Sequence, residues 1–181
     1  MGRSQTNRIV KIGLETFLTS LYFFYSHGSL VLLSLIPSLT RALQMWYSET
    51  PLWSEAIVGT TRVFLFLFIV TALTRSSLHQ LKGKAFWNKL LQSCSRHFEI
   101  NWPHGVISQI IAFIILLYGI GNGLIILAST LFISAMDTLG VNLADTAAAK
   151  DACIYFLKNM SVIPLAIVFI LKMLGVKPVK D

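Results

Sequence analysis

Charged residues are scarce in this chain. They make up 13% of its 181 residues, about half the charged share of an ordinary soluble domain, whereas apolar residues make up 55%. A soluble fold of this size needs charged side chains on the outer face of every element, and here whole stretches have none. The deficit disfavours a soluble globular domain and indicates one domain, residues 1–181, whose solvent is the lipid bilayer.

Cysteines and catalytic motifs are scarce as well. The two cysteines, Cys94 and Cys153, are predicted on opposite sides of the membrane, which excludes a disulfide within the chain. No cysteine spacing is typical of a metal site, and the histidines between the second and third spans are too scattered to suggest one: His79, His97 and His104. No span contains G-x-S-x-G, H-E-x-x-H or a carboxylate pair, and no glycine loop with a lysine is present to bind phosphate. We therefore expect no metal or cofactor, and enzyme activity is disfavoured.

Four apolar stretches predict an all-α integral membrane protein with four transmembrane helices. They lie at residues 14–36, 56–73, 105–136 and 152–172, and about 20 helical residues suffice to cross the hydrocarbon. The first stretch has a rival interpretation as a signal peptide cleaved near Ser26-His27-Gly28, but the apolar run resumes directly afterwards. The third stretch is too long for a straight span, so it should tilt, kink at its glycines or continue into the interface. We expect Pro164 to kink the fourth.

Basic residues predict the orientation. The net charge is +7, with 15 Lys and Arg against 8 Asp and Glu. Nucleic acid is not the expected partner, because these residues cluster at the ends of apolar runs. The leader holds three (Arg3, Arg8, Lys11), the 74–103 connection five (Arg75, Lys82, Lys84, Lys89, Arg96) and the tail three (Lys172, Lys177, Lys180), whereas the other two loops hold only Arg41 and Lys150. This bias predicts a multi-pass plasma-membrane protein with both termini cytoplasmic.

Two connections have the pattern of amphipathic helices lying on the membrane. Between Pro37 and Trp53, apolar residues follow helical spacing and end in aromatic residues that suit the outer interface. In the 74–103 connection, one face holds Phe86, Leu90, Leu91, Cys94 and Phe98, while Lys82, Lys84, Lys89 and Arg96 surround it. We interpret the second segment as a cytoplasmic anchor to anionic lipids. The alternative is a docking surface for a cytoplasmic partner.

One polar constellation carries a functional hypothesis. Each span places a polar group slightly outward of its middle: His27, Arg62, Asn122 and Lys158, the last beside Asn159. Acidic residues occur only near span ends, so a shared site would hold two unneutralised cations and attract an anion. The structural alternative is that Arg62 and Lys158 pair with Glu55 and Asp151, which lie two turns outward on the same helices, or extend toward headgroups. The matching Glu55–Arg62 and Asp151–Lys158 spacing also hints at an internal repeat.

Gly119 and Gly123 form a G-x-x-x-G in the third span, a spacing that favours close helix packing within the chain or dimerisation. Three functions fit these features. The leading prediction is an accessory or interaction subunit of a membrane complex, favoured by small size and missing catalytic motifs. The alternatives are a small oligomeric transporter or channel with the anion-attracting site at mid-membrane, and a lipid-modifying membrane enzyme.

Overall fold

The computed structural model describes residues 3–141 and 145–177, and these residues are helical with no strand among them. The basic leader and the first apolar segment form α1 (Arg3–Ser26) and α2 (Gly28–Tyr47), and α3 (Leu52–Thr74) follows. A short turn, η1 (Gln80–Lys82), leads to α4 (Lys84–Asn101). A long rod consists of α5 (His104–Ala112), a π-helical segment η2 (Phe113–Gly121) and α6 (Asn122–Thr138). The last rod consists of α7 (Thr146–Leu157), a π-helical turn η3 (Lys158–Val162) and α8 (Ile163–Met173). Lys180 lies outside the described residues, as do the side chains of Arg3 and Arg8.

Four helices in the described part are long and apolar enough to cross a membrane. They are Gly28–Tyr47, Leu52–Thr74, His104–Thr138 and Thr146–Met173. The three later ones match the predicted spans with slightly wider bounds. At about 1.5 Å per residue, even the shortest, with 20 residues, reaches about 30 Å. The chain is therefore compatible with a multi-pass membrane protein.

The first predicted span differs from the structure. Residues 14–36 do not form one helix, because the helix breaks at His27 (φ −102°, ψ 84°). The side chains of Ser26 and His27 both reach the carbonyl of Phe23, at 3.0 Å and 2.7 Å, the acceptor that the next helical N–H would use. Side chains that satisfy a backbone carbonyl in this way compete with the helix ladder, and Gly28 adds little helix propensity to restore it.

The predicted outer interfacial helix is not a separate element. Residues 37–47 continue α2 through Pro37, which is buried inside the helix. The turn to α3 comes at Ser48, whose left-handed φ of 53° ends α2. Trp46, Tyr47 and Trp53 remain exposed around this turn. The chain therefore bends at His27, where the local hydrogen bonding differs from that of a helix, and not at Pro37.

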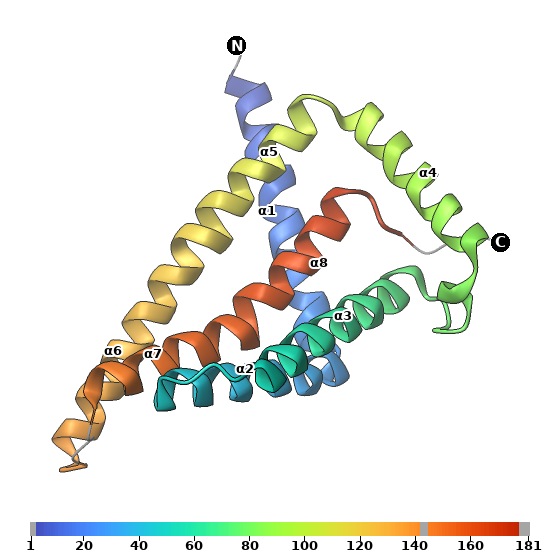
Figure 1. Ribbon diagram of the computed structural model, residues 1–181. Helices are drawn as coiled ribbons and strands as arrows, with labels where there is room; N and C mark the ends of the chain where they lie inside the picture. The colour runs from blue at the N-terminus through green and yellow to red at the C-terminus, as the bar shows by residue number, and fades with distance from the viewer. Residues whose placement is uncertain (1–2, 142–144, 178–181) are drawn as a thin grey trace.

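The helices converge at one end and diverge toward the other (Figure 1). The α2–α3 turn and the α6–α7 connection lie at the converging end, while the N-terminus, α4 and the C-terminal segment lie at the diverging end. Helix α7 packs along α2, and α1 lies against α5 and α8. Residues of α1, α3 and α8 supply much of the buried core, including Phe24, Leu65, Ile69, Val168 and Phe169.

Several buried hydroxyl groups bond to carbonyls of their own helix. Ser34, Ser38, Thr61 and Thr74 are buried, and each hydroxyl donates to the carbonyl one turn earlier, at 2.6–2.8 Å. A hydroxyl bonded to its own helix adds little polarity to the surface, so the helix can pack against apolar neighbours. On α7 the residues buried toward the rest of the chain include Ala149 and Ala152, whose small side chains permit close approach to α2.

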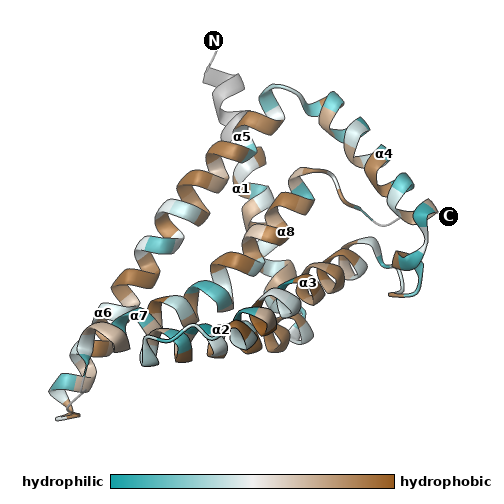
Figure 2. Ribbon diagram, viewed as in Figure 1, coloured by the Kyte–Doolittle hydropathy of each residue, from teal (hydrophilic) through white to brown (hydrophobic). Residues whose placement is uncertain are grey.

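The α5–η2–α6 rod is the least buried of the four candidate spans. Only 11% of its most apolar window is buried, against 28–33% for the other three candidate spans. Figure 2 shows this rod as predominantly hydrophobic along its length. Exposed Ile114, Tyr118, Leu124 and Leu131 contribute to that surface. Apolar side chains exposed over a whole helix fit a lipid or partner-helix environment better than water.

Helix α4 folds back onto the diverging end through part of its apolar face. Leu90 is buried and belongs to the core, with Phe86, Trp87 and Cys94 packed against it. The Trp87 indole N–H donates to the Leu81 carbonyl at 2.6 Å. Two residues predicted on the same face, Leu91 and Phe98, are instead exposed, as are the four cations Lys82, Lys84, Lys89 and Arg96.

Candidate functional site

The four residues predicted to share one level do not form a single site. The structure joins Arg62 of α3 to the Lys158–Asn159 turn of η3, and it leaves His27 and Asn122 in local hydrogen bonds of their own. Asn122 is half-buried and donates to the carbonyl of Tyr118 in the same rod, at 2.7 Å. His27 contacts the Phe23 carbonyl and lines a separate recess near the ends of α3 and α8.

Arg62 binds across helices to an amide. Its guanidinium Nη2 donates to Oδ1 of Asn159 at 2.6 Å, and Asn159 is 3% exposed. The Asn159 amide nitrogen is itself fixed, because it donates to the Tyr155 carbonyl at 2.8 Å. The acceptor offered to Arg62 is therefore held rigidly and is electrically neutral. A neutral acceptor orients the guanidinium without cancelling its charge.

A second donor of the same guanidinium has no partner. The Nε atom of Arg62 is buried and makes no hydrogen bond to the described part of the protein. Buried donors are nearly always paired, because leaving one unpaired costs about 1–3 kcal/mol. Arg62 is thus held at one nitrogen, while its buried Nε has no hydrogen-bond acceptor and its charge has no carboxylate partner among the described residues.

The carboxylate expected to neutralise Arg62 is occupied elsewhere. Both oxygens of Glu55 accept from the guanidinium of Arg41 at 2.5 and 2.8 Å, which ties the end of α2 to the start of α3. Gln44 extends this cluster with donations to Ser54 and Glu55 at 2.5 and 3.2 Å. The alternative in which Arg62 simply pairs with Glu55 is not what the structure contains.

Sequence reasoning assigned Arg41 only to the outer loop and missed this cluster. The sequence did contain a signal for it, because Arg41 and Glu55 lie on either side of the short turn between α2 and α3.

Lys158 also lies without a carboxylate. Its ammonium is 5.9 Å from the centroid of the Tyr155 ring, one turn earlier on the same rod. Among the described residues, no Asp or Glu oxygen lies within 4.0 Å of either Arg62 or Lys158. Because Arg41 and Glu55 neutralise each other, two positive charges remain uncompensated around the α3–η3 contact. Such charges within a candidate span are costly unless something neutralises them.

The helices at this contact are locally unwound. Segments η2 and η3 are π-helical, lie in the two long rods and contact each other. Pro164 explains the second, since it has no N–H for the carbonyl four residues earlier and the wider turn takes up the mismatch. A π-helical turn thus precedes Pro164, whereas the kink expected there stays a prediction. Wide turns of this kind occur often at functional sites.

The predicted packing glycines face no other helix. A Cβ at Gly123 would meet nothing within 4 Å, and one at Gly119 would meet only the Ile114 carbonyl of its own rod. Gly121 is the glycine that faces a neighbour, with Val162 of η3 at 3.5 Å from its Cβ position. Gly119 and Gly123 therefore lie on the open surface of the rod, where close packing would require another molecule.

Comparisons with known proteins add no assignment to this geometry. No protein-family model matches the chain, and no curated protein or solved structure matches it at a significant level.

Proposed function

We propose that this chain is a multi-pass protein of the plasma membrane that binds an anion at Arg62 and Lys158 and acts as a small oligomeric transporter or channel. The main support is the hydrogen bond between Arg62 and Asn159. This bond positions a guanidinium within a candidate span against a neutral amide, with its Nε unpartnered. An anion would supply both the missing acceptor and the missing negative charge.

The surrounding structure favours transport over a purely structural cation pair. Asn159 lies in the π-helical segment η3, which contacts the second π-helical segment η2, and irregular turns within spans are a usual place for ion and substrate sites in transporters. The exposed G-x-x-x-G at Gly119 and Gly123 offers a surface for self-association.

Three variants that lower the net charge equally test the site. Arg62→Gln removes the cation, Asn159→Asp gives it a fixed carboxylate of nearly the same shape, and Lys150→Gln removes a charge near the α7 N-terminus as a control. Chloride, phosphate and sulfate efflux from proteoliposomes is the readout. Losing one charge-assisted contact, about 1.5–3 kcal/mol, should lower anion affinity or flux about tenfold or more in the first two variants. The Lys150 variant should retain wild-type flux.

Asn159→Asp is the sharpest of the three, because it places a carboxylate beside Arg62 and removes the need for an external anion, at the cost of the amide donation to the Tyr155 carbonyl. Wild-type anion flux in a folded Asn159→Asp protein would contradict the proposal. So would the absence of flux and binding for all three anions in the wild type.

A second candidate is an interaction subunit of a larger membrane complex. The observation that favours it is the open α5–η2–α6 rod, only 11% buried over its most apolar window. Intact-assembly mass spectrometry after purification in mild detergent separates the two candidates. A second polypeptide at fixed stoichiometry supports the subunit, and a homo-oligomer supports the transporter.

The orientation of the chain has its own test. The basic diverging end is proposed to face the cytoplasm. In a protein lacking Cys94 and Cys153, a cysteine at exposed Thr50 should react with an impermeant maleimide in intact cells. A cysteine at exposed Ser95 should react only after permeabilisation. The reverse pattern would place the termini outside.

A further inference from the structure

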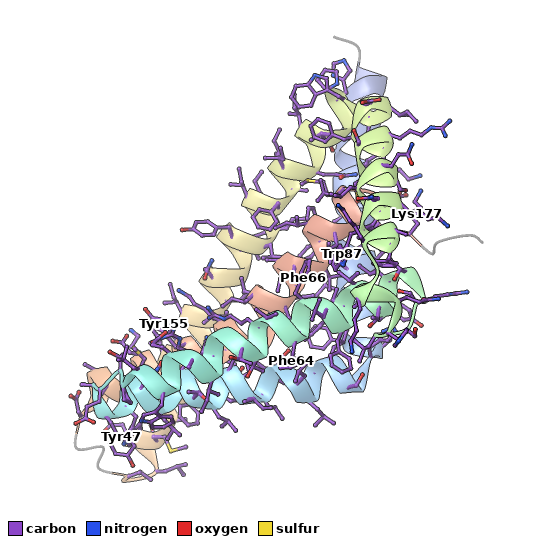
Figure 3. The ribbon with its side chains drawn as sticks, turned by 45° about the vertical axis from the view of Figure 1, so that its right-hand side comes forward. Tyr47, Phe64, Phe66, Trp87, Tyr155 and Lys177 are labelled. Carbon is purple, nitrogen blue, oxygen red and sulfur yellow. The ribbon has the colours of Figure 1, made fainter. Side chains whose placement is uncertain are left out.

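A recess of about 500 Å³ lies at the diverging end, apart from the Arg62 site. It is formed by α1, by the C-terminal ends of α3 and α8, and by the segment after α8. Its polar lining consists of Thr16, Thr19, His27, Arg75, Lys172 and Lys177. Figure 3 places Lys177 beside α4, far from Tyr155 of the Arg62 site, which lies toward the converging end. The two basic sites are thus spatially distinct.

The charge in this recess has one sign. Three cations, Arg75, Lys172 and Lys177, line it, and no Asp or Glu is among its described lining residues. Lys172 is anchored, since its ammonium donates to the Thr19 carbonyl at 2.6 Å and lies 5.3 Å from the centre of the Phe23 ring. Arg75 and Lys177 are exposed and make no ion pair with the described residues.

Helix C-termini usually disfavour an anion, and here that effect is reduced. The Thr71 carbonyl at the end of α3 accepts from the N–H groups of Arg75 and Ser76. At the end of α8, the carbonyls of Leu171 and Lys172 accept from Val176 and Gly175. Carbonyls capped in this way contribute less negative potential, so the three cations dominate.

The remaining lining and the position of the recess point to a lipid. Phe23, Ala72, Leu73 and Val176 supply apolar walls next to the cations. The recess lies where two candidate spans end, which is the level of phospholipid headgroups. On the other side of Arg75 a second recess of about 310 Å³ includes Lys89 of α4, so the basic surface continues onto that helix. Basic pockets between spans on the cytoplasmic side are suited to phosphate headgroups.

We infer that this recess binds the phosphate of an anionic phospholipid, with Arg75 and Lys177 contacting the phosphate, Lys172 held behind them, and the apolar wall receiving the start of an acyl chain. The site depends on neither Arg62 nor Asn159. The recess would hold one lipid at a defined position, whereas the exposed cations of α4 would attract anionic lipids without binding any one of them at a defined place.

Native mass spectrometry of the full chain, titrated with phosphatidylglycerol, phosphatidylcholine or inorganic phosphate, tests the assignment. The variant Arg75→Gln/Lys177→Gln removes two lining charges. The control Lys11→Gln/Lys150→Gln removes two charges that lie outside the recess and outside the basic α4 segment. The wild type and the control should retain one phosphatidylglycerol in preference to phosphatidylcholine. The recess variant should bind it about thirtyfold more weakly, since each of the two cations contributes about 1 kcal/mol to such binding.

Equal phosphatidylglycerol affinity in both double variants would overturn the inference, because only the total charge would then matter. Binding of inorganic phosphate without retained phospholipid would assign the recess to free phosphate and overturn the lipid assignment. If the double variant does not fold, the single variants Lys177→Gln and Lys11→Gln are compared instead, because Lys177 lies beyond the last helix and Lys11 lies outside the recess. Loss of lipid binding there supports the site, and unchanged binding contradicts it.

Discussion

The contact between α1 and α5 depends on a missing side chain. Gly13 is buried in α1, and a Cβ added there would lie 2.6 Å from the Cβ of Ala112 and 3.0 Å from the carbonyl oxygen of Ser108. Neither atom belongs to a flexible side chain, so no side-chain rotation can relieve the clash that Gly13→Ala would create. Carbon atoms pack optimally at about 3.5–4.0 Å, which means that the two helices must separate by about 1 Å.

The expected cost follows from that displacement. Overpacking of a tight contact costs about 1–3 kcal/mol. Alanine recovers up to about 1 kcal/mol of helix propensity, which offsets part of it. Gly59→Ala is the matched control, because Gly59 lies in α3 and its added Cβ would meet nothing within 4 Å. The control should therefore be neutral or slightly stabilising, while Gly13→Ala should destabilise.

Thermal unfolding in detergent measures the difference, at about 2–4 °C of Tm per kcal/mol for a chain of this size. Removing the opposing methyl with Ala112→Gly should partly rescue Gly13→Ala, with a coupling free energy above about 0.5 kcal/mol. Rescue should be incomplete because the Ser108 carbonyl remains. Equal Tm values for Gly13→Ala and Gly59→Ala, or additive effects at positions 13 and 112, would refute the close α1–α5 crossing.

Two further predictions concern the docking of α4 on the turn after α8. Gly175 adopts a left-handed φ of 81° and an added Cβ would overlap the His97 ring, so Gly175→Ala should increase hydrogen exchange in α4 while Gly123→Ala should not. Burial, and secondarily the charge of Lys177, lowers the pKa of His97 below its usual 6.5. A lowered pKa means that docking is complete above about pH 6.5 and weakens as the pH falls below it, because the undocked state binds the proton more readily. The protection of α4 from hydrogen exchange should therefore decrease between pH 7.5 and pH 5.5, and this decrease should be smaller in His97→Gln. If the pH dependence in His97→Gln equals that of the wild type, another group causes it.

The class of structure could be read from composition and run length. Charge scarcity together with stretches of about 20 or more apolar residues predicts helices suited to a bilayer whatever their partners are, and the later three candidate spans lie where the pattern placed them. The grouping of the termini opposite two loops also follows from counting helices. These properties depend on the chain's own hydrogen bonding and on transfer of side chains from water, both of which are local.

The bend at His27 was less predictable, because proline is the stronger statistical signal for a helix boundary. The structure carries α2 through Pro37 and breaks the helix where two side chains capture one carbonyl. Likewise, His27 and Arg62 were expected at one level by counting residues from span centres. That count assumes a straight first span, whereas the chain bends at His27, which lines a recess at the C-terminal ends of α3 and α8.

The sequence by itself determined which kinds of residues lie inside the apolar stretches. It places two cations, Arg62 and Lys158, in spans with no acidic residue within one helical turn, and it concentrates basic residues in the leader, the 74–103 connection and the tail. Only the tertiary structure decided their partners. It assigned Glu55 to Arg41, Asn159 to Arg62, and Arg75, Lys172 and Lys177 to one recess. The reason is physical, since the energy of a charge within a fold depends on which oppositely charged or polar atoms lie within a few ångströms. Residues far apart in the chain reach that distance only through helix packing.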